Sequence, residues 1–139
     1  IIYYTKFIMK NIILKLIEYV YYLSLATLLI LYLFPGSLIG YLLYGDLRQQ
    51  PNLVDNPIGT SINHLFYFLY LSLLGLIDRS RKQRLLNSFQ FLFSISILLE
   101  LMHFLIPNRA FEFYDLLANS AGVILIYLFL KLFIKKNTR

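Results

Sequence analysis

The chain has 139 residues, of which 59% are hydrophobic and only 14% charged, and its mean hydropathy is +0.67. This composition lies well outside that of soluble domains and predicts an integral membrane protein. The chain contains no cysteine, which excludes disulfides and thiolate sites. Its net charge of +6 is divided among short segments beside apolar runs, so we expect no nucleic-acid partner.

Four apolar segments are each long enough, or nearly so, to cross the roughly 30 Å hydrocarbon layer once as a helix. They cover residues 16–34, 62–77, 85–106 and 116–134. Pro35 follows the first segment and Pro107 follows the third, and proline cannot comfortably extend a helix. We therefore predict an all-α, polytopic membrane protein with four transmembrane helices in an antiparallel bundle, forming one domain over residues 1–139.

The region before the first apolar segment is basic. Met9-Lys10-Asn11 is typical of a bacterial translation start, so residues 1–8 could be an upstream extension. No small-x-small cleavage pattern follows the first segment, so we expect this segment to remain as a membrane anchor.

The basic residues predict the orientation of the bundle. All but two of the 13 Lys and Arg lie before the first segment, between the second and third, or at the end of the fourth. The two exceptions are Arg48 and Arg109. Because cytoplasmic loops carry the excess of Lys and Arg, both termini are expected in the cytoplasm. The protein is then a multi-pass protein of the inner or plasma membrane.

The longest connection, residues 35–61, joins the first and second segments on the outer side. Its first part, PGSLIGYLLYGD, is apolar and could form a short helix at the membrane interface. Gly36 and Gly40 have the GxxxG spacing of close helix packing, although simple turns would explain both glycines equally well.

Polar and ionisable side chains gather at the outer ends of the segments. They are His64, Glu100, His103, Arg109, Asp115 and Asn119. An ionised carboxylate such as Glu100 costs about 2.5–3.5 kcal/mol at the centre of a membrane helix, so it is expected to have a partner. His103 follows Glu100 at i+3, and Asn119 follows Asp115 at i+4, so each pair shares a helix face. We predict that all six form an outward-facing ligand-binding pocket.

Each of these residues also has a purely structural interpretation. Asp115 could cap the fourth helix, and Asn119 could form hydrogen bonds between helices. Arg109 could face lipid phosphates, and the two histidines could be ordinary interfacial residues. Glu100 could be a buried partner of Arg109 or His103.

The Glu-x-x-His spacing of Glu100 and His103 occurs in carboxylate-bridged metal sites of helical bundles, but those sites use it twice. This chain contains it once. His64, His103 and Glu100 would supply three zinc ligands, yet nothing in the sequence determines their separation. We therefore assign no metal site and no cofactor. Glu112 lies in the last loop and is expected to be solvated.

The third and fourth segments carry a motif that resembles the C-terminal motif of the VanZ-like family, named for a membrane protein associated with teicoplanin resistance. The matching positions are Glu100, His103, Pro107, Arg109, Asp115, Asn119 and Gly122. The family usually has glutamine at position 103. Its other motif is an Asp-Lys pair followed by a histidine; His64 matches, but Thr60 and Ser61 replace the pair. Phe68 stands where the family often has tyrosine.

This resemblance covers the chain from about residue 12. It implies a small polytopic protein of the cell envelope, of a kind linked in some members to glycopeptide tolerance. It implies no known reaction, and the replaced Asp-Lys pair puts in doubt any role that depends on that pair. We do not carry teicoplanin resistance over to this chain.

Three functions are compatible with these residues. The first is binding of a polar or anionic envelope ligand, such as a lipid head group or lipid-linked wall precursor, with Arg109 engaging the anion. The alternative is a membrane hydrolase or transferase on a lipid-linked substrate, with Glu100 or His103 as general base. The third is a structural accessory subunit. The expected partners are membrane lipids, and whether the protein is an enzyme or an oligomer stays open.

Overall fold

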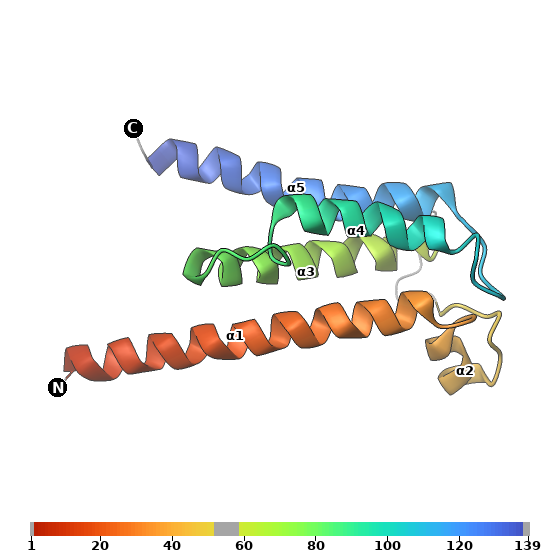
Figure 1. Cartoon of the computed structure of the whole chain (residues 1–139), viewed down its shortest axis with the longest axis horizontal. Helices are drawn as coiled ribbons and strands as arrows, with labels where there is room; N and C mark the ends of the chain where they lie inside the picture. Colours follow the sequence, from red (N-terminus) through yellow and green to blue (C-terminus); the bar gives the residue numbers. More distant parts are fainter. Residues whose placement is uncertain (1, 52–58, 138–139) are drawn as a thin grey trace.

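The structure is a computed structural model that describes residues 2–51 and 59–137. Over these residues the regular structure is entirely helical, which confirms the predicted all-α class (Figure 1). The elements in chain order are α1 (Ile2–Leu33), α2 (Leu38–Tyr44), α3 (Ser61–Arg81), α4 (Phe89–Met102) and α5 (Phe113–Asn137).

Three helices of the described chain are long and apolar enough to cross a membrane. These candidate spans are Phe7–Leu33, Ser61–Arg79 and Phe113–Leu132. The chain is therefore a small helical, multi-pass membrane protein. The third predicted segment, 85–106, is a shorter apolar helix, because α4 has only 14 residues. At 1.5 Å per residue α4 is about 21 Å long, less than the roughly 30 Å of the hydrocarbon layer.

Local hydrogen bonds explain why α4 is shorter than predicted. At its start the Ser88 hydroxyl accepts the backbone N–H of Phe91, so the residues before Phe89 form a cap and not a helical turn. At its end the backbone N–H groups of residues 103–105 each donate to a carbonyl three residues earlier. This tighter turn ends the α-helix at Met102, before Pro107 is reached.

The other helices extend beyond the predicted segments. α1 has 32 residues and begins well before residue 16, because no proline or glycine interrupts the chain before Pro35. α3 and α5 likewise include the basic residues that follow their apolar parts, since a helix can continue into the interface after the hydrocarbon layer ends.

The helices form a bundle in which α3 packs against both α5 and α1, and α4 packs against α5. The start of α1, the α3–α4 connection and the end of α5 lie towards the same end of the molecule, which we call the basic end (Figure 1). α2 and the α4–α5 connection lie at the opposite end, which we call the site end.

The core follows one stripe of α1. Tyr21, Leu25, Leu28 and Tyr32 are buried and are spaced four, three and four residues apart, which is the period of one helix face. α5 approaches α3 at Gly122, where a Cβ atom would lie 2.7 Å from the carbonyl oxygen of Leu65. The two helices therefore meet backbone to backbone at this glycine.

The short helix expected in the outer connection is present as α2. Ser37 caps it through a hydrogen bond from the backbone N–H of Gly40. Gly36 has a φ of +93°, and a side chain at Gly40 would overlap the carbonyl oxygen of Gln49. The two glycines therefore close a turn against the following loop. This agrees with the interpretation of their spacing as simple turns.

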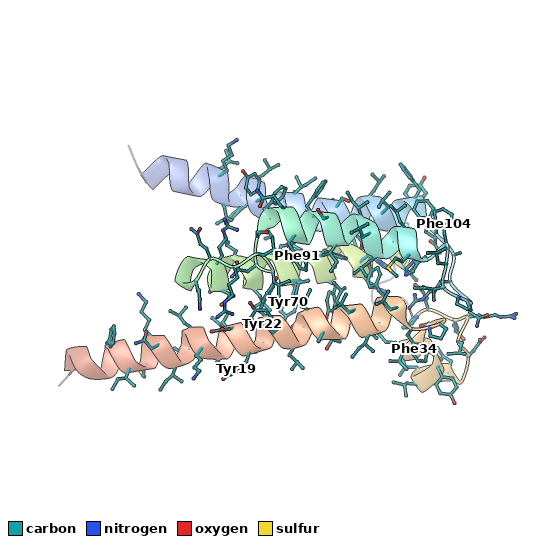
Figure 2. The ribbon with its side chains drawn as sticks, viewed as in Figure 1. Tyr19, Tyr22, Phe34, Tyr70, Phe91 and Phe104 are labelled. Carbon is teal, nitrogen blue, oxygen red and sulfur yellow. The ribbon has the colours of Figure 1, made fainter. Side chains whose placement is uncertain are left out.

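Large apolar side chains cover the outside of the bundle (Figure 2). Leu23 and Leu132 are each 70% exposed, and Figure 2 shows Tyr19 and Phe104 on the outer surface of the ribbon, far apart along the bundle. Contiguous apolar surface of this extent is rare on soluble monomers, whereas lipid tails would cover it. The exterior is consistent with a bundle that is surrounded by membrane.

Candidate functional site

The six polar residues predicted from the sequence lie at the site end. His64 is on α3, Glu100 and His103 are at the end of α4, Arg109 is in the α4–α5 connection, and Asp115 and Asn119 are on α5. Four of them, Glu100, His103, Asp115 and Asn119, are at most 3% exposed. Burial of so many polar groups is costly unless they are hydrogen-bonded, so their partners determine what the site can do.

A directed chain of hydrogen bonds through Tyr32 joins four helices. The Tyr32 hydroxyl of α1 donates to Oδ1 of Asn119 at 2.7 Å, and Nδ2 of Asn119 donates to the backbone carbonyl oxygen of Ser96 on α4. Nδ1 of His64 lies 2.5 Å from the same hydroxyl. Since the single hydroxyl proton is used towards Asn119, Nδ1 of His64 must be the donor in that contact.

Asp115 connects α5 to α3. Its Oδ1 accepts a hydrogen bond from the Ser61 hydroxyl at 2.5 Å, and its Oδ2 lies 3.4 Å from Nε2 of His64. Although Asp115 stands in the first turn of α5, its carboxylate faces another helix. A tertiary contact therefore describes this side chain better than the capping interpretation.

Glu100 is completely buried in the last turn of α4. Its Oε1 lies 3.1 Å from Nδ1 of His103 and accepts the backbone N–H of Glu112 at 3.1 Å. Its other oxygen, Oε2, has no hydrogen-bond partner among the described residues. One half of this carboxylate is therefore held in place, and the other half is unsatisfied.

His103 immediately follows α4. Its ring stacks on the ring of Tyr32, with centroids 5.4 Å apart and planes inclined by 16°. While Nδ1 faces Glu100, Nε2 is buried and has no hydrogen-bond partner within the described chain. The i+3 pairing with Glu100 predicted from the sequence is thus present.

Arg109 binds the end of α1. Its Nη2 donates to the carbonyl oxygen of Leu31 at 2.5 Å, and its Nε donates to that of Phe34 at 3.4 Å. Carbonyl groups in the last turn of a helix lack partners within the helix, and a cation there complements the helix dipole. Burial lowers the pKa of Arg109, and the nearby Tyr32, Glu100 and Asp115 oppose that shift. The half-buried guanidinium thus has protein partners, unlike a loop cation that only faces lipid phosphates.

Glu112 has an exposed side chain, as predicted. The limited burial of its carboxyl group, followed by repulsion from Asp115 and Glu100, raises the pKa of Glu112 above the usual range. Its contribution to the cluster is the backbone N–H bound to Glu100.

A cavity of about 310 Å³ opens beside the cluster, between α1, α2 and α3. Its walls are mainly apolar and include Leu28, Leu31 and Leu38. His64 and Arg109 also line it, whereas the other four predicted site residues do not.

Sequence reasoning missed three contributors to this site. Tyr32 has the helical spacing of the buried stripe, so its burial could have been predicted, but nothing indicated that its hydroxyl would meet His64. Ser61 was noted only as a departure from the Asp-Lys pair, although it binds Asp115. Ser96 contributes its backbone carbonyl, which no side-chain pattern can indicate.

From the sequence, His64, His103 and Glu100 were weighed as possible zinc ligands. The structure brings together a different group of three possible metal ligands. Possible ligand atoms of His64, Glu100 and Asp115 all lie within 4.8 Å of one another. Comparison of the chain with protein-family models, curated proteins and solved structures gave no match.

Proposed function

We propose that the protein binds, at its site end, the polar or anionic head group of an envelope lipid or lipid-linked precursor. In this proposal four segments cross the membrane, α4 and its flanking turns form the short crossing, and both termini are cytoplasmic. The site end then faces the outer leaflet, where such head groups are found.

The cavity beside Arg109 is the observation that carries the proposal. Leu28, Leu31 and Leu38 offer apolar contact to a tail or linker, while Arg109 and His64 offer donors to a head group. A pocket that is mostly apolar with a few convergent polar groups is typical of small-molecule sites, and about 310 Å³ lies at the lower end of their volumes. Arg109 uses two N–H groups on α1, and a guanidinium has five, so others are available to an anion.

Membership of the VanZ-like family is part of this proposal. Its support is that four of the five polar positions of the motif, which span residues 100–119, are buried at the site end, and the fifth, Arg109, is half-buried there. The departures at Thr60 and Ser61 fall in the same region, and Ser61 there binds Asp115.

Native mass spectrometry of protein extracted gently from membranes tests the proposal. Wild-type protein should retain a lipid, and Leu38→Trp should lose it because the indole fills the cavity that Leu38 lines. Leu42→Trp is the matched control, because Leu42 is 73% exposed on the same helix and does not line the cavity. Equal lipid retention by both variants would contradict the proposal. Arg109→Ala should also lose the lipid, with folding verified because Arg109 binds α1.

A membrane hydrolase or transferase is the second candidate. Glu100 and His103 favour it, because each has a buried polar atom without a partner in the described chain. Under this candidate Glu100→Gln keeps the bound lipid-linked substrate but yields no product, and unchanged turnover would exclude Glu100 as general base. If instead every site variant only lowers the folded yield, the structural accessory subunit is the better description.

A further inference from the structure

We propose that His64, Glu100 and Asp115 bind one divalent transition-metal ion, such as Zn²⁺. The three side chains come from α3, α4 and α5, and their ligand atoms lie within 4.8 Å of one another. This inference concerns the protein without any lipid, so its test does not depend on whether the proposed head-group site exists.

The hydrogen bond of His64 to Tyr32 directs the other ring nitrogen of His64 towards Asp115. The Nδ1–H of His64 donates to Tyr32, whose own proton is directed to Asn119. The neutral imidazole therefore presents a lone pair at Nε2, 3.4 Å from Oδ2 of Asp115. Two acceptors that face each other repel unless a proton or a metal ion lies between them.

Each candidate ligand is held by a hydrogen bond at one of its two polar side-chain atoms, and its second polar atom is available to a metal ion. Nδ1 of His64 is bound to Tyr32, Oδ1 of Asp115 to Ser61, and Oε1 of Glu100 to the backbone of Glu112. Metal-binding residues typically have this arrangement, in which outer hydrogen bonds orient the ligand and its second atom binds the metal.

The unsatisfied oxygen of Glu100 favours a metal ion, and not a proton, as the group between His64 and Asp115. A proton on Nε2 of His64 would satisfy Asp115, but Oε2 of Glu100 would remain buried without a hydrogen-bond partner among the described residues. One divalent ion bound to all three residues would satisfy every one of these atoms and neutralise two buried carboxylates. The single imidazole favours zinc and similar ions over Mg²⁺ and Ca²⁺, which prefer oxygen ligands alone.

His103 is not part of the proposed site. Its Nδ1 faces Oε1 of Glu100, and its ring stacks on Tyr32. Three protein ligands leave a fourth coordination position open, as in zinc sites that bind water or a substrate. His64 also lines the cavity, so the site and the cavity share a wall.

The test is equilibrium dialysis of chelator-treated protein in detergent against Zn²⁺, followed by elemental analysis. The protein should carry a tag without histidine, because the chain has two His and no Cys of its own and thus little background affinity. We expect one Zn²⁺ per chain, with at least a tenfold preference over Mg²⁺. His64→Ala and Asp115→Asn should weaken binding at least tenfold, and Ser61→Ala about tenfold, because outer hydrogen-bond partners typically contribute 10–100-fold.

Glu100→Gln and Glu112→Gln form a matched pair, since both remove a carboxylate at the site end and only Glu100 belongs to the proposed set. Glu100→Gln should lose Zn²⁺ and Glu112→Gln should retain it. X-ray absorption of the wild-type protein with Zn²⁺ should show one nitrogen and two oxygen ligands from protein, and this measurement needs no variant to fold. The proposal is overturned by failure of folded wild-type protein to take up stoichiometric Zn²⁺, or by equal uptake in the His64, Glu100 and Asp115 variants.

Discussion

Tyr32 determines the direction of the hydrogen bonds at the site end. Its hydroxyl contacts both His64 on α3 and Asn119 on α5. Removing this oxygen would take away the hydrogen bond that His64 and Asn119 each make with Tyr32.

Tyr32→Phe is therefore expected to lower the free energy of unfolding by roughly 1–3 kcal/mol, the usual cost of unsatisfied buried polar groups. The measurement is thermal unfolding in detergent. Tyr70→Phe is the control, because the Tyr70 hydroxyl makes an exposed contact with Ser24 and its loss should change stability by less than about 0.5 kcal/mol. Equal melting temperatures for both variants would show that the Tyr32 contacts contribute little.

The sequence predicted which polar residues gather at the site end but not how they are connected. Helical spacing placed His103 beside Glu100, and the short loop brought α5 next to α4. The partner of His64 could not be predicted, because Tyr32 is one of twelve tyrosines and is separated from His64 by a long connection. Such contacts depend on how far each helix is shifted and rotated against its neighbours, which local patterns do not encode.

The α3–α5 contact includes a position where only a small residue fits. A Cβ at Gly122 would lie 2.7 Å from the carbonyl oxygen of Leu65 and 2.8 Å from the backbone nitrogen of Leu69. Backbone atoms within a helix cannot move aside individually, so relief requires α5 to separate from α3.

Gly122→Ala should accordingly destabilise the protein by about 1–3 kcal/mol, as overpacking generally does. Gly75→Ala provides the comparison, because there the nearest atoms belong to the side chains of Tyr21 and Leu92 and not to the backbone of a neighbouring helix. We expect the smaller loss of thermal stability at Gly75. The opposite order would contradict the close approach of α3 and α5.

The α3–α4 connection is held by a buried amide at the basic end. Nδ2 of Asn87 donates to Oδ2 of Asp78 and to the carbonyl oxygen of Lys82, each at 2.8 Å. Oδ1 of Asn87 accepts the backbone N–H of Arg84. The Arg84 side chain bonds to Tyr22 and Glu18 of α1, and these hydrogen bonds raise the pKa of Arg84.

Asn87→Ala removes three hydrogen bonds and leaves the buried Asp78 carboxylate without its donor, so the loss should again be about 1–3 kcal/mol. Limited proteolysis should cleave the connection faster in this variant than in wild type. Gln83→Ala, at an exposed position in the same connection, should leave both the melting temperature and the cleavage rate unchanged. Unaltered proteolysis of the Asn87 variant would mean that other contacts hold the connection.

For the whole molecule, composition and hydropathy were sufficient to predict a helical membrane protein, and three of the four predicted segments are candidate spans. The length of α4 was not predictable from apolar residues alone, because Leu85, Leu86 and residues 104–106 are as apolar as the helix but lie in the turns at its two ends. Hydropathy measures solubility in lipid, whereas the helix ends depend on local hydrogen bonding.

Orientation is the remaining property of the whole molecule, and the absence of cysteine makes it directly measurable. Gln83 lies in the α3–α4 connection at the basic end, and Ala110 lies in the α4–α5 connection at the site end; both are exposed. The positive-inside rule places the basic end in the cytoplasm. In intact cells, a membrane-impermeant maleimide should therefore label Ala110→Cys, and should label Gln83→Cys only after the membrane is permeabilised.

The same pair of variants also tests whether α4 crosses the membrane. If its roughly 21 Å, with the turns at both ends, does not span the bilayer, the two connections lie on one side and both cysteines share one labelling pattern. Opposite labelling in the reversed sense would instead place the site end in the cytoplasm and exclude head groups of the outer leaflet as its ligands. Labelling of Ala110→Cys alone in intact cells is the result that the four-span topology requires.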